Sequence, residues 1–214
     1  MDDGLVAAAR SSKGFMPDDE GMALYRAGVA AAEAVCGPLV EIGTYCAKSA
    51  VYLGAAAREA GTVVFSIDHH RGSEENQAGW EHHDPAVVDP RHGLMDTLPF
   101  ARDTIARAGL EDTVVLVVGP SATVAAHWSP PVALLFIDGG HSAQVAWDDY
   151  HGWAHRVAPG GLLAIHDVFS DPARGGRPPY EIYLEALASR RFEERPELGC
   201  GSLRVLRRAA ATST

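Results

Sequence analysis

Two carboxylates and two imidazoles follow apolar runs in the second half of the chain. Asp138 and His141 come after one run, and His166 and Asp167 come after the next. Carboxylates can hold a divalent cation, and an imidazole with an ordinary pKa of about 6.5 can accept a proton near neutral pH. Because neighbouring parallel strands end at the same edge of a sheet, we expect the four side chains to share one crevice. Buried charges there would be costly without a cation or a partner, which favours a functional cluster over packed polar groups of the core.

A second candidate site joins a predicted strand (38–42) to a predicted helix (47–60) through a tight turn. Gly43 in the turn lets a ligand approach the backbone, whose N–H groups point outward over the end of the strand. The preceding carboxylate, Glu41, can orient the loop or bind a ligand that carries an ammonium group. The turn has one glycine, so it differs from the G-x-G-x-x-G loops that bind dinucleotides, and a plain strand-to-helix turn is the alternative.

The elements that must position these residues alternate between strand-like and helical patterns. Continuous runs of valine, leucine and isoleucine are typical of parallel strands that are covered on both faces. The sequence therefore predicts an α/β fold: a Rossmann-like, doubly wound, mostly parallel sheet of seven strands that ends in an antiparallel hairpin. The expected strands are 38–42, 62–67, 113–118, 132–137, 161–165, 192–195 and 202–206, and the expected helices are 19–36, 47–60, 96–108, 142–157 and 180–190.

Two further residues lie where a nucleoside could bind. Asp68 ends the second strand, and a carboxylate at that position of an α/β sheet can accept both hydroxyls of a ribose. The same arrangement occurs in proteins that bind NAD and in proteins that bind S-adenosylmethionine (SAM). It predicts an adenosine-containing ligand without choosing between them. Ser121 follows the third strand and could also cap the next helix.

Composition and charge narrow the class of protein. A chain of 214 residues fits a single domain, 1–214, and no apolar run is long enough to span a membrane. The acidic N-terminus is unlike a secretory signal, so we expect a cytoplasmic protein whose three cysteines are reduced. A net charge of −10 argues against nucleic acid as a partner.

The segment 69–94 is long and polar for a connection between two elements, and we interpret it as an insertion on the acceptor side of the site. It is rich in histidine and contains a tryptophan. An aromatic face can pack on a ring, and neutral imidazoles can bind hydroxyl groups. His69, His70 and Trp80 are therefore candidate substrate-binding residues, together with Arg174 from a later loop; a solvated flap is the alternative reading of the segment.

The stretch E-I-G-T-Y-C-A-K-S at 41–49 resembles motif I of SAM-dependent methyltransferases, in the E-[LIV]-G-x-Y-C-x-x-S form of catechol O-methyltransferase-like enzymes. The resemblance implies a class I SAM-dependent O-methyltransferase. In that family an N-terminal segment folds over the cofactor, which makes Phe15 and Met16 candidates for a lid; a hydrophobic staple ahead of the first helix is the alternative. The implied cofactor-binding residues are Phe15, Met16, Glu41, Gly43, Thr44, Tyr45, Ser49, Asp68, Ser121, Ala122 and Asp138.

The acid and histidine cluster resembles that of metal-dependent O-methyltransferases. This implies a divalent metal, Mg²⁺, held by Asp138, His166 and Asp167, with His141 as the catalytic general base. The Asp-x-x-His spacing is similar to that of sugar O-methyltransferases of macrolide biosynthesis. The IDGGH and HD strings resemble an actinobacterial branch that includes the methylmannose polysaccharide 1-O-methyltransferase.

His166 departs from the pattern, because the relatives carry a carboxylate there and Mg²⁺ prefers oxygen ligands. Either Asp138 and Asp167 bind the ion together with water and substrate oxygens, or a more nitrogen-tolerant ion such as Mn²⁺ is used.

The predicted function is SAM-dependent, metal-assisted methylation of a hydroxyl on a small-molecule acceptor. A sugar is preferred (a methylated mannoside at its 1-O position, in polysaccharide biosynthesis), with a catechol or other phenol as the alternative. An NAD-linked oxidoreductase is disfavoured by the missing G-x-G-x-x-G pattern and by the C-terminal hairpin, which is typical of SAM methyltransferases. A non-catalytic SAM- or sugar-binding module is disfavoured by the intact cluster, and a homo-oligomer is compatible with the sequence.

Overall fold

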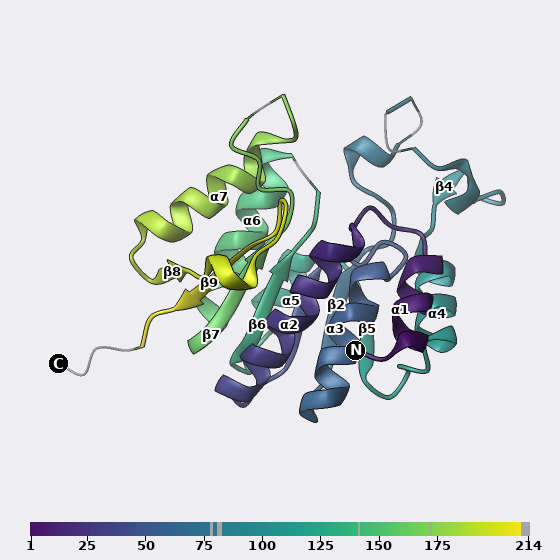
Figure 1. Ribbon diagram of the computed structural model, residues 1–214. Coiled ribbons are helices and arrows are strands. Elements are labelled where there is room, and N and C mark those ends of the chain that lie inside the picture. The colour runs from purple at the N-terminus through teal and green to yellow at the C-terminus, as the bar shows by residue number, and fades with distance from the viewer. Residues whose placement is uncertain (78, 81–82, 141, 172, 211–214) are drawn as a thin grey trace.

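The computed structural model describes residues 1–77, 79–80, 83–140, 142–171 and 173–210, and a seven-stranded sheet forms its centre (Figure 1). The strand order is β5-β2-β1-β6-β7-β9-β8. Neighbouring strands are parallel from β5 to β7, whereas β9 runs antiparallel to β7 and β8. This confirms the predicted fold class. The strands of the sheet are β1 (Leu39–Ile42), β2 (Val64–Asp68), β5 (Val114–Val118), β6 (Val132–Ile137), β7 (Val157–Ile165), β8 (Phe192–Glu194) and β9 (Arg204–Arg208).

Helices cover both faces of the sheet and bury one apolar core on each side. Residues of α1 to α4 share a core with one set of strand side chains, and residues of α5 to α7 share a second core with the alternate set. Burial on both faces explains why the parallel strands read as continuous apolar runs. The helices are α1 (Asp3–Ser11), α2 (Asp18–Ala34), α3 (Lys48–Ala60), α4 (Leu98–Arg107), α5 (Ser121–Ala126), α6 (Ala143–Trp153) and α7 (Arg177–Ala188). None of the helices that the structure describes has both the length and the apolarity to span a bilayer.

The register of the sheet brings four strand ends to one level. Ile42 of β1 is paired with Ile67 of β2 and with Ile137 of β6, and Ile137 is paired in turn with Ile165 of β7. The chain winds outward from β1 in one direction and from β6 in the other, so the strand order reverses between these two strands. Ligands bind outside the carboxyl ends of the strands at such a reversal.

Two regions differ from the sequence-based expectation. Residues 3–11 form α1, which was not predicted; the Asp2 side chain caps it by accepting the N–H of Leu5, and Leu5 and Ala9 are buried one turn apart. At the end of the 69–94 segment, β3 (Val88–Asp89) and β4 (Leu94–Met95) form a short hairpin that was not predicted.

Gly43 has a structural role that the sequence did not reveal. Its φ is +97°, and a Cβ at this position would lie 2.1 Å from the carbonyl oxygen of Asp138. The glycine is therefore required by the approach of the turn after β1 to the end of β6. This backbone contact holds the two candidate sites against each other.

Replacement of this glycine should be costly. Gly43→Ala should lower the free energy of unfolding by about 2–5 kcal/mol, because a left-handed backbone and a steric clash both add to the cost. Gly61→Ala is the matched control: its φ is +70°, but a Cβ there would meet nothing within 4 Å. It should cost only about 1–2 kcal/mol. Urea unfolding measures both values, and equal losses would contradict the role assigned to Gly43.

Candidate active site

The structure brings Asp138, His166 and Asp167 together at the carboxyl ends of β6 and β7. His166 Nδ1 lies 2.9 Å from Asp138 Oδ1 and 3.5 Å from Asp167 Oδ2. One potential ligand atom from each of the three residues lies within 4.8 Å of the others. These three side chains therefore lie together, as the sequence predicted. The fourth predicted member of the cluster, His141, lies outside the described residues.

A fourth residue, Glu20, belongs to this cluster and was missed in the sequence. It lies in the first turn of α2, and its Oε2 accepts a hydrogen bond of 2.6 Å from His166 Nε2. Its other oxygen accepts the N–H of Ser202, at 2.6 Å. Both Glu20 and His166 are buried, with 6% and 4% exposure. Three acidic residues begin α2, so Glu20 resembles the carboxylates that commonly stabilise helix N-termini, and nothing local distinguishes it.

The charges of this cluster depend on one another. Burial disfavours the imidazolium, but Asp138, Asp167 and Glu20 outweigh burial and hold the pKa of His166 well above its ordinary value. Burial likewise opposes the Glu20 carboxylate, yet its bonds from His166 and Ser202 lower its pKa. The cluster therefore holds three carboxylates around one imidazole, and it attracts positive charge.

The turn after β1 is tied to the end of β2. The Tyr45 N–H donates to Asp68 Oδ2 at 2.8 Å, and the His70 N–H donates to Asp68 Oδ1 at 2.7 Å. Below the turn, the hydroxyls of Thr44 and Ser66 are 2.6 Å apart. Asp68 thus binds the turn after β1 with one oxygen and the segment after β2 with the other, while part of its side chain stays exposed.

Glu41 lies beneath the turn and is fully buried. The Ser66 hydroxyl donates to its carboxylate. Burial raises the pKa of Glu41 to about 8, although the hydroxyls of Ser49 and Ser66 pull it down. Of the two roles expected for Glu41, this placement favours orienting the loop over binding an ammonium group.

Strained backbone is concentrated at the same edge of the sheet. Among the described residues, five that are not glycine have a positive φ, and four of these follow the carboxyl ends of β1, β2 and β7. Such conformations cost about 1–3 kcal/mol each and persist where the surrounding structure imposes them. The four residues are Tyr45, Ala47, His70 and Asp167.

Ser121 binds a partner that differs from the expected one. Pro120 occupies the N-cap of α5 without a side-chain bond, so the prediction that Ser121 caps this helix is wrong. Its hydroxyl instead donates to Asp149 of α6, because that buried carboxylate needs a donor. Burial raises the pKa of Asp149 to about 6, despite the bond from Ser121. Ala122, the other predicted neighbour of adenine, is exposed.

The N-terminal segment crosses the start of α3. A Cβ on Gly14 would lie 2.8 Å from the Lys48 Cβ, so the two segments touch. Met16 is buried in the core, whereas Phe15 is 61% exposed and packs on the Tyr45 ring with centroids 5.4 Å apart. Lys13 forms an ion pair of 2.6 Å with Asp84 of the 69–94 segment. Of the two predicted lid residues, only Phe15 faces outward beside the turn.

The candidate acceptor residues differ in their surroundings. His70 is buried and its Nδ1 lies 2.8 Å from the Thr97 hydroxyl, while burial lowers its pKa. His69 and Trp80 are exposed, and the Arg174 guanidinium lies over the Phe169 ring.

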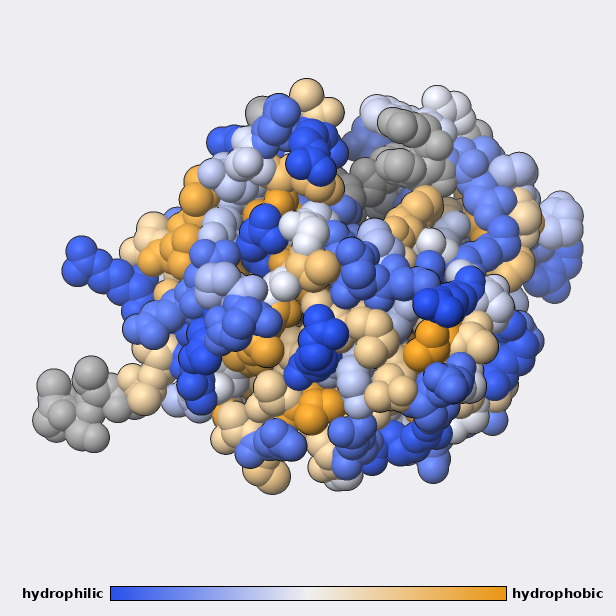
Figure 2. Space-filling model, in the orientation of Figure 1, coloured by the Kyte–Doolittle hydropathy of each residue, from blue (hydrophilic) through white to orange (hydrophobic). Residues whose placement is uncertain are grey.

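Two protrusions flank this edge of the sheet. The segment 69–94 stands on one side and the loop between β7 and α7 on the other (Figure 1). The surface dips between them (Figure 2).

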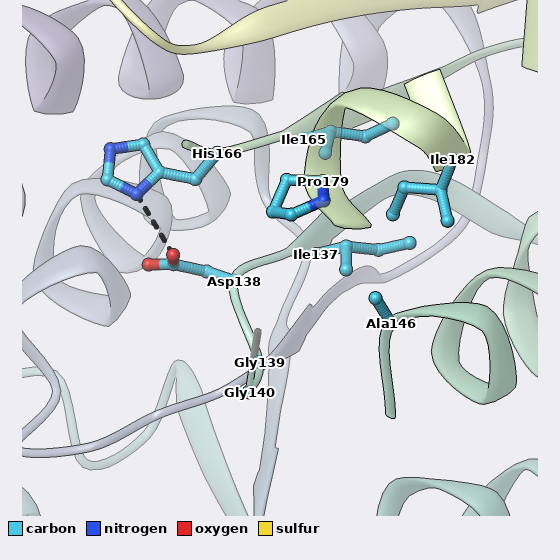
Figure 3. A pocket seen from close by; sticks show the side chains of 9 residues that line it. All are labelled: Ile137, Asp138, Gly139, Gly140, Ala146, Ile165, His166, Pro179 and Ile182. Carbon is cyan, nitrogen blue, oxygen red and sulfur yellow. Dashed lines mark hydrogen bonds and ion pairs between the residues drawn. The ribbon is translucent and has the colours of Figure 1, made fainter. Parts of the chain in front are cut away.

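A recess opens beside the charged cluster. Figure 3 shows Asp138 and His166 turned toward each other at one end and aliphatic side chains gathered at the other. Strands β6 and β7 and helices α6 and α7 supply its walls. The lining residues are Ile137, Asp138, Gly139, Gly140, Ala146, Ile165, His166, Pro179 and Ile182.

A comparison with models of known protein families identifies the family of this chain. The profile of a family described as a methyltransferase domain matches residues 40–168, more than half of the chain, from β1 to just beyond β7. The chain belongs to this methyltransferase family. Membership confirms the SAM-dependent methyltransferase expected from the turn after β1, and the NAD-linked oxidoreductase is set aside.

Solved structures share the fold of this methyltransferase at low sequence identity. Cofactor-bound Rv0187 from MTB is 18% identical, with a TM-score of 0.65, over 96% of this chain and 87% of that one. The O-methyltransferase TomG from Streptomyces achromogenes, involved in tomaymycin synthesis and solved with SAM, is 14% identical (TM-score 0.65; 98% and 91% covered). An O-methyltransferase from Bacillus cereus in complex with SAH is 17% identical (TM-score 0.63; 98% and 91% covered).

The buried Glu41 should make stability depend on pH. Between about pH 4.5 and pH 8 the folded protein keeps a proton that the unfolded chain has lost, so the free energy of unfolding should fall as the pH rises. Glu41→Gln removes this contribution. Relative to the unmodified protein, the variant should gain up to about 1.4 kcal/mol per pH unit within the window and nothing more above it. Urea unfolding across this range measures the difference, and parallel curves for the two proteins would contradict the prediction.

Proposed function

We propose that this methyltransferase transfers the methyl group of SAM to a hydroxyl oxygen of a small-molecule acceptor, with the assistance of a divalent cation. The observation that carries the proposal is the convergence of Asp138, His166 and Asp167 beside the turn that contains Gly43. A cofactor-binding turn and a cation-attracting cluster in contact are what a metal-assisted methyl transfer requires.

The residues at the turn fit SAM. Asp68 keeps an exposed edge for ribose hydroxyls, and Ser121 and Ala122 begin the helix after β5, where the adenine ring would lie. Phe15 stands over Tyr45 and would cover the ligand. When bound, SAM supplies a methyl group on a positively charged sulfur.

The residues at the cluster fit a divalent cation. Neighbouring ligands of an octahedral ion with bonds of about 2.1 Å lie about 3 Å apart. The separations of 2.9 and 3.5 Å between His166 Nδ1 and the two aspartates are close to this spacing. When bound, the ion would make an acceptor hydroxyl more acidic.

The chain's own residues then have separate tasks. Asp138, His166 and Asp167 would hold the cation that orients the acceptor. The imidazole of His141, three residues after Asp138, takes the proton from the acceptor hydroxyl. The acceptor oxygen forms the new C–O bond as the C–S bond breaks. Alignment of the two reactants in a cleft of low water content supplies much of the rate gain.

A sugar hydroxyl is the preferred acceptor, specifically the 1-O position of a methylated mannoside. The polar, histidine-rich segment 69–94 at the rim of the site supports a hydroxyl-rich ligand, with exposed His69 and Trp80 available to it. The aliphatic side chains beside Asp138 favour the second candidate, a phenol or catechol, because they offer an apolar surface on which an aromatic ring could pack. TomG acts in the synthesis of a small molecule, which agrees with either class.

Removal of the proposed base should abolish the chemistry and spare binding. His141→Ala should lower turnover by about 10²- to 10⁴-fold, because no other side chain is assigned to accept the proton. The SAM dissociation constant, measured by calorimetry, should stay within about twofold. His127→Ala, an exposed histidine at the end of α5, is the control and should keep full turnover. Retained activity in His141→Ala would remove this residue as the base.

A screen of acceptors with radiolabelled SAM tests the substrate class. Incubation with methylmannosides, other sugars and catechols, each with and without a chelator, should give a labelled product that disappears when divalent ions are removed. Label on sugars would support the preferred acceptor, and label on catechols alone would select the second candidate. Turnover that is indifferent to the chelator would remove the cation from the proposal.

A further inference from the structure

Both ring nitrogens of His166 are engaged, and they face different partners. Nδ1 faces the aspartates of the proposed cation site, whereas Nε2 donates to Glu20 on the far side of the ring. A carboxylate accepts a hydrogen bond and cannot donate one, so Glu20 fixes the proton on Nε2. Nδ1 in the same way donates a proton to Asp138 at 2.9 Å, and a bound cation would displace this proton while Nε2–H stays on Glu20. The lone pair left on Nδ1 would then face the ion between Asp138 and Asp167, which is the arrangement a nitrogen ligand needs.

We propose that Glu20 is a positioning residue that holds His166 as a nitrogen ligand of the cation site, so that the site prefers a nitrogen-tolerant ion such as Mn²⁺ over Mg²⁺. This inference rests on the proposed function, because it concerns the same cation site. Histidines that bind metals commonly donate their second ring nitrogen to a carboxylate, which orients the ring and makes it a stronger ligand.

Glu20 is itself held rigidly, as such a role requires. Its Oε1 accepts the N–H of Ser202 at 2.6 Å, and its Oε2 accepts the Ser202 hydroxyl at 3.1 Å in addition to His166. The turn before Ser202 closes on the carboxylate so tightly that a Cβ on Gly201 would lie 2.0 Å from Oε1. With three donors around it and almost no exposure, Glu20 has no freedom to turn toward another partner.

The ligand atoms of the proposed cation site determine which ion it prefers. Two carboxylates and one imidazole suit a transition-metal ion, whereas Mg²⁺ demands oxygen ligands and gains little from nitrogen. An aspartate in place of His166 would give an all-oxygen set, and Glu20 would then repel the new carboxylate instead of orienting it.

The test measures binding of the ion and needs no turnover. Mn²⁺ is titrated into the metal-free protein and free Mn²⁺ is read by electron paramagnetic resonance, with Mg²⁺ as competitor. Glu20→Gln should weaken Mn²⁺ binding by about 10- to 100-fold and lower the preference for Mn²⁺ over Mg²⁺. Glu33→Gln, an exposed carboxylate on the same helix, is the control and should change neither value.

A double-mutant cycle separates positioning from a general loss of structure. In a His166→Ala background, Glu20→Gln should have no further effect on Mn²⁺ binding, because the ring through which Glu20 acts is gone. Where Glu20→Gln fails to fold, Ser202→Ala takes its place; it removes one of the three donors to Glu20 and should weaken Mn²⁺ binding by a smaller factor. Unchanged Mn²⁺ affinity in the folded variant, additive losses in the cycle, or equal affinity of the unmodified protein for Mg²⁺ and Mn²⁺ would overturn the proposal.

The same titration distinguishes this inference from the proposed function. Tight Mn²⁺ binding that depends on Glu20, without methyl transfer to any acceptor, would leave the inference standing and remove the function. Methyl transfer that proceeds while Mn²⁺ affinity is indifferent to Glu20 would do the reverse.

Discussion

The contact between Gly43 and the carbonyl oxygen of Asp138 is the constraint on which the rest of the site depends. It joins the turn after β1 to the end of β6 where the strand order reverses, so no side chain can separate the two. The sheet register places the ends of β2 and β7 at the same level. A slip of one residue would turn Asp68 or His166 to the opposite face, so the apolar cores on both faces also fix the site.

Beside this contact, carboxylates surround a single histidine, His166. Glu20 of α2 adds a third carboxylate to the cluster. It binds Nε2 of His166, on the opposite side of the ring from the aspartates at Nδ1. Three acids around one imidazole leave an excess of negative charge in a poorly solvated place, which is unfavourable until a cation compensates it. The cluster therefore attracts positive charge although one of its members is a histidine.

Sequence reasoning located the side chains that follow strand ends and missed those whose placement depends on pairing between distant segments. Asp68, Asp138 and Asp167 follow apolar runs, and parallel strands bring such residues together in any doubly wound sheet. Glu20 could not be found in this way, because its partners are 146 and 182 residues away and the acid-rich start of α2 offered a local explanation. The capping role considered for Ser121 was wrong for the same reason, because its partner, the buried Asp149, is distant in the sequence.

The C-terminal hairpin has a role in the site as well as in the fold. β9 pairs with β7 through the residues that precede His166, and the turn before β9 delivers Ser202 to Glu20. The cluster therefore depends on contacts among the first turn of α2, the end of β7 and this hairpin. A ligand held by Asp138 and His166 would bind only the folded arrangement of these segments, so it would stabilise the whole domain. The hairpin therefore completes the sheet and also supplies a donor to the buried Glu20 carboxylate.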